Sequence, residues 1–135
     1  MRYGEILHVL GGLLMAVAVA MIPAGVLGVF EGLWLGWLIS LLVPALLGLA
    51  FFVLTPREVD LSPREALAIV GLGWRGIVLT GALPFLLTGT TNSIVWALFE
   101  SVSGFTTTGA TVFAVIEELP ASILLWRSLS HWIGG

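Results

Sequence analysis

The stretch Phe99-Glu-Ser-Val-Ser-Gly-Phe-Thr-Thr-Thr-Gly-Ala-Thr111 places small hydroxyl residues and glycines inside a chain that is otherwise strongly apolar. In hydrocarbon, each unpaired backbone N–H or C=O costs several kcal/mol, so irregular backbone at membrane depth must be buried in protein or line a watery cavity. This stretch therefore predicts a path for a polar solute.

The composition supports a membrane location. Hydrophobic residues make up 59% of the 135 residues and charged residues only 10%, whereas soluble domains are about 45–50% apolar. So few charges cannot cover a globular surface, so we expect the lipid bilayer or partner proteins to contact most of the chain. A net charge of −3 without any lysine argues against nucleic acid as a partner.

Other function classes lack their residues in this sequence. There is no cysteine, and the two histidines, His8 and His131, are isolated, so neither a thiolate metal site nor a ligand cluster is expected. No nucleophile-base-acid set, phosphate-binding loop or dinucleotide-binding glycine pattern is present. We therefore expect neither an enzyme nor a cofactor.

Three apolar stretches, residues 6–30, 33–54 and 66–87, are long enough to cross a bilayer, which takes about 20 residues. The first two form a tight hairpin, and Pro44 is read as a packed kink in preference to a functional break. Residues 55–65 concentrate charges and prolines and predict a linker. Within it, Ser62 predicts a helix N-cap because Pro63 and an acidic residue follow.

The arginines predict the orientation of the chain. Arg2, Arg57 and Arg64 fall on the side shared by the N-terminus and the linker, whereas the hairpin turn carries Glu31. By the positive-inside rule the N-terminus is cytoplasmic. The chain after residue 87 then emerges on the outer face.

Residues 92–102 are too short to cross again, since a helix of this length spans roughly 16 Å at 1.5 Å per residue. They predict a helix that dips into the membrane, with cap candidates Thr90, Thr91 and Asn92 at its start. Gly104 suits a left-handed position just past its end. Residues 105–111 are expected to return outward as extended backbone, and Pro120 announces another helix.

A short helix entering from outside directs its partially negative carboxyl end at the membrane interior, where a cation is favoured. Extended backbone after it can turn carbonyl oxygens inward to replace the hydration shell of a monovalent ion. Gly109 allows a geometry that a side chain would obstruct. An ordinary Ser/Thr/Gly loop remains the alternative for this pattern alone.

Together with Ile116-Glu-Glu-Leu-Pro120 and Leu125-Trp-Arg-Ser-Leu-Ser-His-Trp-Ile-Gly-Gly135, the stretch that begins at Phe99 resembles the Trk-type potassium uptake family, specifically its TrkH-like membrane subunit. The resemblance covers the whole chain in layout, and its closest motifs lie in residues 99–135. It implies an all-α membrane protein: an introductory transmembrane hairpin (1–54), a cytoplasmic linker (55–65) and a partial membrane-pore-membrane repeat (66–135) with a re-entrant pore helix, a filter loop and a truncated inner helix.

The resemblance also implies a function. Potassium would pass the cytoplasmic (inner) membrane through a pseudo-fourfold pore, with the transported ion bound by backbone carbonyls. One quarter of the selectivity filter would consist of Thr107, Thr108, Gly109 and Ala110. Homodimers and a cytosolic TrkA-type nucleotide-binding regulatory subunit are implied as partners. Because one filter strand cannot enclose an ion, we expect a truncated product or fragment that is inactive alone; the alternative is a small non-conducting membrane protein that stabilises or regulates a larger complex.

Several polar residues have two readings. Arg75 lies near the middle of the third span, where it is either an electrostatic element of the conduction path or a structural partner for Glu100 or for helix-end carbonyls. Arg127 belongs to the matched motif or snorkels to the interface. Glu117 and Glu118 either attract cations at the outer mouth or are solvated loop charges. The tryptophans are expected to be packing or interface anchors.

Overall fold

Three long helices form one side of the molecule in this computed structural model, which describes residues 3–55 and 61–135. They are α1 (Tyr3–Phe30), α2 (Trp34–Leu54) and α3 (Pro63–Leu87). All three are long and apolar enough to cross a membrane, so a long apolar helix is confirmed at the position of each expected span. Each remains a continuous helix although α1, α2 and α3 contain Pro23, Pro44 and Pro84, respectively. At most 33% of the residues in each apolar stretch are buried, so these helices need lipid or further protein around them.

The hairpin of α1 and α2 is held together by close backbone contact. A Cβ atom on Gly11 of α1 would lie 2.7 Å from the carbonyl oxygen of Gly48 on α2. Small residues let membrane helices approach in this way, and dispersion contacts then hold them. Gly32, with φ 76°, makes the turn between the two helices.

Ser62 is the N-cap of α3, as predicted, and it forms a capping box with Glu65. The Ser62 side chain accepts a hydrogen bond from the backbone N–H of Glu65, and the Glu65 carboxylate accepts one from the backbone N–H of Ser62. Pro63 occupies the first helical position. Residues 56–60, which contain Arg57, and Arg2 lie outside the described residues, so the expected linker is seen only at its two ends.

The short helix α4 (Ile94–Phe105) is present, but both of its predicted ends are wrong. Ser93 is the N-cap, and its hydroxyl accepts from the backbone N–H of Trp96. Gly104 lies inside the helix, where a Cβ would be 2.2 Å from the Ser130 hydroxyl oxygen. Glycine is therefore required there by the contact with the next helix and not by a left-handed turn; the left-handed residue is Thr107, with φ 56°.

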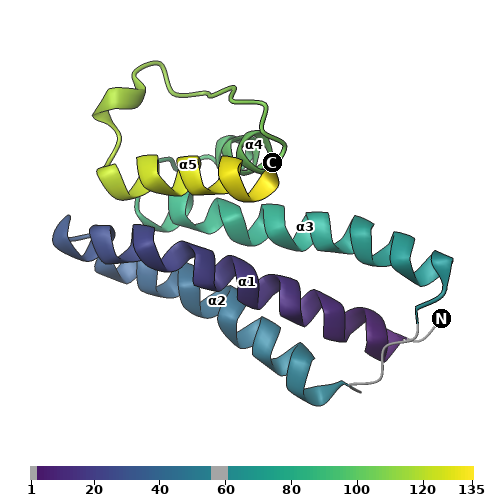
Figure 1. Cartoon of the computed structure of the whole chain (residues 1–135). Coiled ribbons are helices and arrows are strands. Elements are labelled where there is room, and N and C mark those ends of the chain that lie inside the picture. Colours follow the sequence, from purple (N-terminus) through teal and green to yellow (C-terminus); the bar gives the residue numbers. More distant parts are fainter. Residues whose placement is uncertain (1–2, 56–60) are drawn as a thin grey trace.

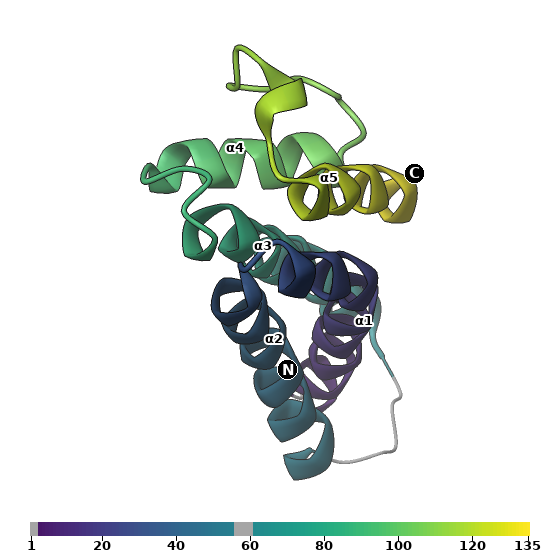
Figure 2. The same ribbon diagram turned by 90° about the vertical axis from the view of Figure 1, so that its left-hand side faces the viewer.

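A ten-residue apolar core forms where the helices meet. The last helix, α5 (Ala121–Gly134), follows a short 3-10 turn, η1 (Ile116–Glu118), and packs against α1 and α4. Figure 1 shows α5 next to α3, on the side of the three long helices that faces away from α2. Figure 2 shows α4 from the side, above α3. Trp37 and Trp126 are fully buried in this core, as packing anchors. Their indole N–H groups donate to the Ser122 hydroxyl and the Gly81 carbonyl, respectively, at 3.0 Å.

Candidate functional site

The segment between α4 and η1 arches away from the helices (Figures 1 and 2). Its first part, residues 106–110, is exposed. It begins as a continuation of the α4 hydrogen-bonding pattern, because the N–H groups of Thr107 and Thr108 donate to the carbonyls of Gly104 and Ser103 at 2.9 and 3.0 Å. The start of the segment is thereby attached to the carboxyl end of α4.

The backbone of this segment alternates in handedness. Thr107 has φ 56° and Gly109 has φ 75°, while Thr108 and Ala110 are not in the positive region. A non-glycine residue at positive φ is uncommon and often marks a functional site. Thr107 therefore has an unusual backbone conformation. The sequence does not predict it, because threonine is β-branched and disfavours positive φ.

The carbonyl groups of the segment differ in their partners. The Thr106 carbonyl accepts from the Thr107 hydroxyl at 2.7 Å, and the Ala110 carbonyl accepts from the Ser103 hydroxyl at 2.6 Å. Among the contacts of the described residues, none ends on the carbonyl oxygens of Thr107, Thr108 or Gly109. These three oxygens are available to bind something outside the chain.

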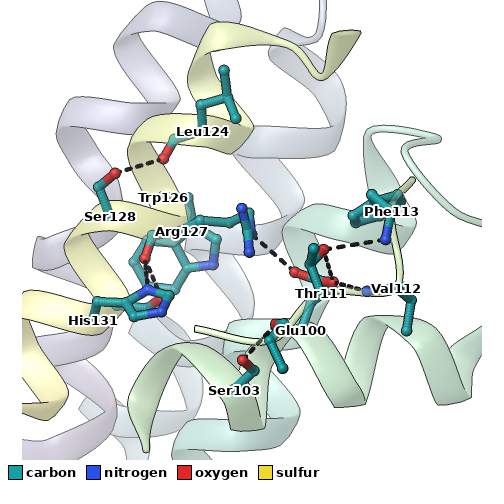
Figure 3. Close-up of polar contacts among 12 residues, drawn as sticks. Glu100, Ser103, Thr111, Val112, Phe113, Leu124, Trp126, Arg127, Ser128 and His131 are labelled. Carbon is teal, nitrogen blue, oxygen red and sulfur yellow. Dashed lines mark hydrogen bonds and ion pairs between the residues drawn. The ribbon is translucent and has the colours of Figure 1, made fainter. Parts of the chain in front are cut away.

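The carboxylate of Glu100, in α4, is buried beside Thr111 and Val112, which follow the exposed part of the segment (Figure 3). Its Oε1 accepts from the Thr111 hydroxyl at 2.5 Å and from the Val112 N–H at 2.8 Å. Its Oε2 accepts from Arg127 Nε of α5 at 2.9 Å. The side chain of Glu100 is 0% exposed and that of Arg127 12% exposed, so this ion pair is screened little by solvent. One carboxylate thus joins three parts of the chain: α4, the end of the segment that follows α4, and α5.

Further polar contacts support this cluster. The Thr111 hydroxyl oxygen accepts from the Phe113 N–H at 3.1 Å, which turns the chain after the exposed segment. On α5, His131 Nδ1 donates to the Arg127 carbonyl at 2.6 Å. No buried side-chain polar atom within the described ranges lacks a hydrogen-bond partner.

The pairing of Arg75 with Glu100, one of the alternatives for this arginine, is wrong, because the oxygens of Glu100 accept from Thr111, Val112 and Arg127. Arg75 is instead exposed on α3, beside an apolar groove lined by leucines of α1 and α3. The pairing of Glu100 with Arg127 was missed, although the cost of two unpaired opposite charges at membrane depth was a signal for it. Glu117 and Glu118 are exposed in η1, and their effect on cations stays a prediction.

Comparison with known proteins identifies the family. Residues 46–135 match the family model of TrkH, described as a cation transport protein. The chain is 38% identical to the Trk system potassium uptake protein TrkH of Halomonas elongata over 96% of its own length, and 35% identical to an uncharacterized cation transporter of Methanocaldococcus jannaschii over 96%. It is 44% identical to TrkH of Escherichia coli K12 over 56% of its length.

These relatives are much longer, and the chain spans 28% of the Halomonas and Methanocaldococcus proteins. The match includes the exposed segment, Glu100 and Arg127, together with the last part of α2 and all of α3, α4 and α5. The apolar helices and the transporter relatives agree on a multi-pass membrane protein. The chain belongs to the TrkH family of cation transport proteins, which are transporters and not enzymes.

Proposed function

We propose that this chain is the N-terminal part of a Trk-type potassium uptake subunit and contributes one quarter of its selectivity filter. In this proposal α4 is a re-entrant pore helix, and residues 66–135 form the first pore repeat after the introductory hairpin. The supporting observation is the run of carbonyl oxygens at Thr107, Thr108 and Gly109 that no described contact occupies.

The chemistry of these oxygens suits a dehydrated monovalent cation. Thr107 and Gly109 have positive φ, whereas Thr108 and Ala110 do not. A backbone that alternates in this way can turn successive carbonyls toward one side of the chain, where they can replace water around potassium. The carboxyl end of α4, with its partial negative charge, lies directly before them. Ala110 completes the proposed filter quarter, with its carbonyl oriented by Ser103.

One such segment supplies only one wall of an ion path, so the isolated chain is expected not to conduct. Further pore loops must close the filter. From the family resemblance we also propose an inner-membrane location with a cytoplasmic N-terminus, a homodimeric full-length subunit and a TrkA-type cytosolic partner. The exposed Arg64 at the start of α3 agrees with this orientation, since positive residues favour the cytoplasmic side.

The test is potassium uptake by the full-length subunit that carries this stretch, expressed in cells that lack their own potassium uptake. Gly109→Arg is expected to abolish uptake at unchanged membrane abundance, because the side chain would enter the path of the ion. The matched control is Gly89→Arg: Gly89 is also an exposed glycine at positive φ, 73° against 75° for Gly109, with nothing within 4 Å of an added Cβ.

Retention of wild-type uptake and ion discrimination in Gly109→Arg would refute the proposal. A non-conducting accessory protein, the alternative, would show no dependence of uptake on either glycine. In liposomes, the 135-residue chain alone is expected to give no potassium flux, and selective flux through it would contradict the requirement for further pore loops.

A further inference from the structure

The Glu100 carboxylate is buried in the protein, where an isolated carboxylate is unfavourable, and its oxygens accept hydrogen bonds from Thr111, Val112 and Arg127. Burying a carboxylate costs several kcal/mol unless donors and a counter-charge replace water. Here a hydroxyl, a backbone N–H and a guanidinium do so, at 2.5, 2.8 and 2.9 Å. A pair of this kind is weak evidence of stabilisation, because apolar residues of similar size often serve a core equally well. Its geometry therefore needs another explanation.

The two oxygens of Glu100 serve two different parts of the chain. Among the described residues, the donors to Oε1 are Thr111 and Val112, which follow the proposed filter, whereas the donor to Oε2 is Arg127 on α5. Figure 3 shows the carboxylate between these two sets of donors. A shift of α5 relative to α4 would thus pull on the same carboxylate that holds the exposed segment.

The exposed segment is anchored to α4 at both ends. Its beginning is held by N–H groups of Thr107 and Thr108 on the last carbonyls of α4. Its end is held by Ser103, through the Ala110 carbonyl, and by Glu100, through Thr111. Between these anchors, three carbonyl oxygens have no described partner. Their spacing is consequently set by the two anchors, and Glu100 is the charged one.

We infer that Glu100 is a positioning residue for ion selection: it does not touch the ion, and it holds the outer end of the filter strand at the distance that favours potassium. Arg127 orients the Glu100 carboxylate for this task. The inference rests on the proposed function. In metal sites, residues that orient the ligating groups change ion affinity about 10–100-fold when removed, and we expect an effect at the lower end of that range here.

The experiment measures potassium uptake by the full-length subunit, per molecule in the membrane, with KM and the preference for potassium over sodium as readouts. Glu100→Gln keeps an oxygen for Thr111 and Val112 but removes the counter-charge of Arg127. It is expected to raise the KM for potassium about tenfold and to lower the preference, with a smaller change in maximal rate. Arg127→Gln should act in the same direction, and the double variant should be less impaired than the sum of the two.

Two further variants keep the inference falsifiable if Glu100→Gln fails to fold. Thr111→Val leaves the ion pair intact and removes one donor to Oε1, so a rise in KM of a few fold is expected. Ser128→Ala is the control on α5: Ser128 is exposed, and its hydroxyl donates to the Leu124 carbonyl of its own helix at 3.1 Å. Its KM and ion preference should equal those of the wild type.

The outcomes separate the inference from the function on which it rests. If Glu100→Gln and Thr111→Val alter abundance or melting temperature but leave KM and ion preference unchanged, the role is structural and the inference is overturned. The proposed function survives this outcome if the wild-type subunit transports potassium and Gly109→Arg does not. If the wild-type subunit shows no potassium uptake, both proposals fall.

Discussion

Replacement of Gly81 by alanine tests whether α4 sits on α3 as the structure places it. Gly81 is buried in α3, and a Cβ atom there would lie 2.5 Å from Phe105 Cε2 and 2.7 Å from the Ser101 hydroxyl oxygen. Neither neighbour is free to move. The Phe105 ring is buried with its edge toward Trp126, at a centroid distance of 6.0 Å, and the Ser101 hydroxyl donates to the Val78 carbonyl at 2.8 Å.

The cost can be estimated from these contacts. Overpacking of one methyl group costs about 1–3 kcal/mol, and loss of the Ser101 hydrogen bond costs about 0.5–1.5 kcal/mol more. Alanine also has a higher helix propensity than glycine, by about 1 kcal/mol. The matched control Gly71→Ala shares that gain, because Gly71 is exposed in the same helix with nothing within 4 Å of an added Cβ. The difference between the two variants is therefore expected to be about 1.5–4.5 kcal/mol.

The assay is thermal unfolding of the wild-type chain and both variants in the same detergent, with size-exclusion chromatography to follow the folded fraction. Gly81→Ala should melt several degrees below Gly71→Ala, since a few kcal/mol is a large part of the stability of a small domain. Equal melting temperatures for the two variants would show that α4 does not press on Gly81, and would refute the packing on which the position of the segment after α4 depends.

Two contacts of α5 with the hairpin give further predictions. Trp37→Phe and Ser122→Ala each remove the buried hydrogen bond between the indole and the hydroxyl, and each should lower stability by about 1 kcal/mol. In a double-mutant cycle from the same unfolding assay the two losses should overlap by at least about 0.5 kcal/mol; full additivity would contradict the contact. Glu31→Gln weakens the acceptor for the Ser122 N–H in the first turn of α5 and should cost no more than about 1 kcal/mol, less at high salt. The control Glu118→Gln should have no measurable effect on melting, and equal losses in both variants would rule out a specific role for Glu31.

Much of the fold follows from local sequence. The three spans depend on uninterrupted apolar length, and the start of α3 depends on Ser62 and Glu65, which are three residues apart. Such features involve neighbours in the chain, so hydropathy and capping preferences predict them. The short helix α4 was also predicted for this reason, although the predicted cap candidates, residues 90–92, all precede the actual N-cap, Ser93.

The candidate site was predicted less completely. The non-helical segment after α4 was predicted from its composition, and its role as a filter stays a prediction. The pairing of Glu100 with Arg127 joins residues 27 positions apart through the packing of α4 on α5. Sequence distance does not reveal which of two arginines at membrane depth faces a carboxylate. Arg75 and Arg127 both satisfied the general requirement for a polar neighbour, and only the arrangement of helices selected Arg127.

The sequence by itself determined that this chain lies in a membrane, where its helices begin and end to within a few residues, and that residues 107–110 interrupt the helical pattern. These properties arise from apolar length and from local backbone preferences. The tertiary structure decided why Gly104 must be glycine, which charge neutralises Glu100, and how the segment after α4 is anchored. Those depend on distances between atoms of separate helices, and such distances exist only once the helices have packed.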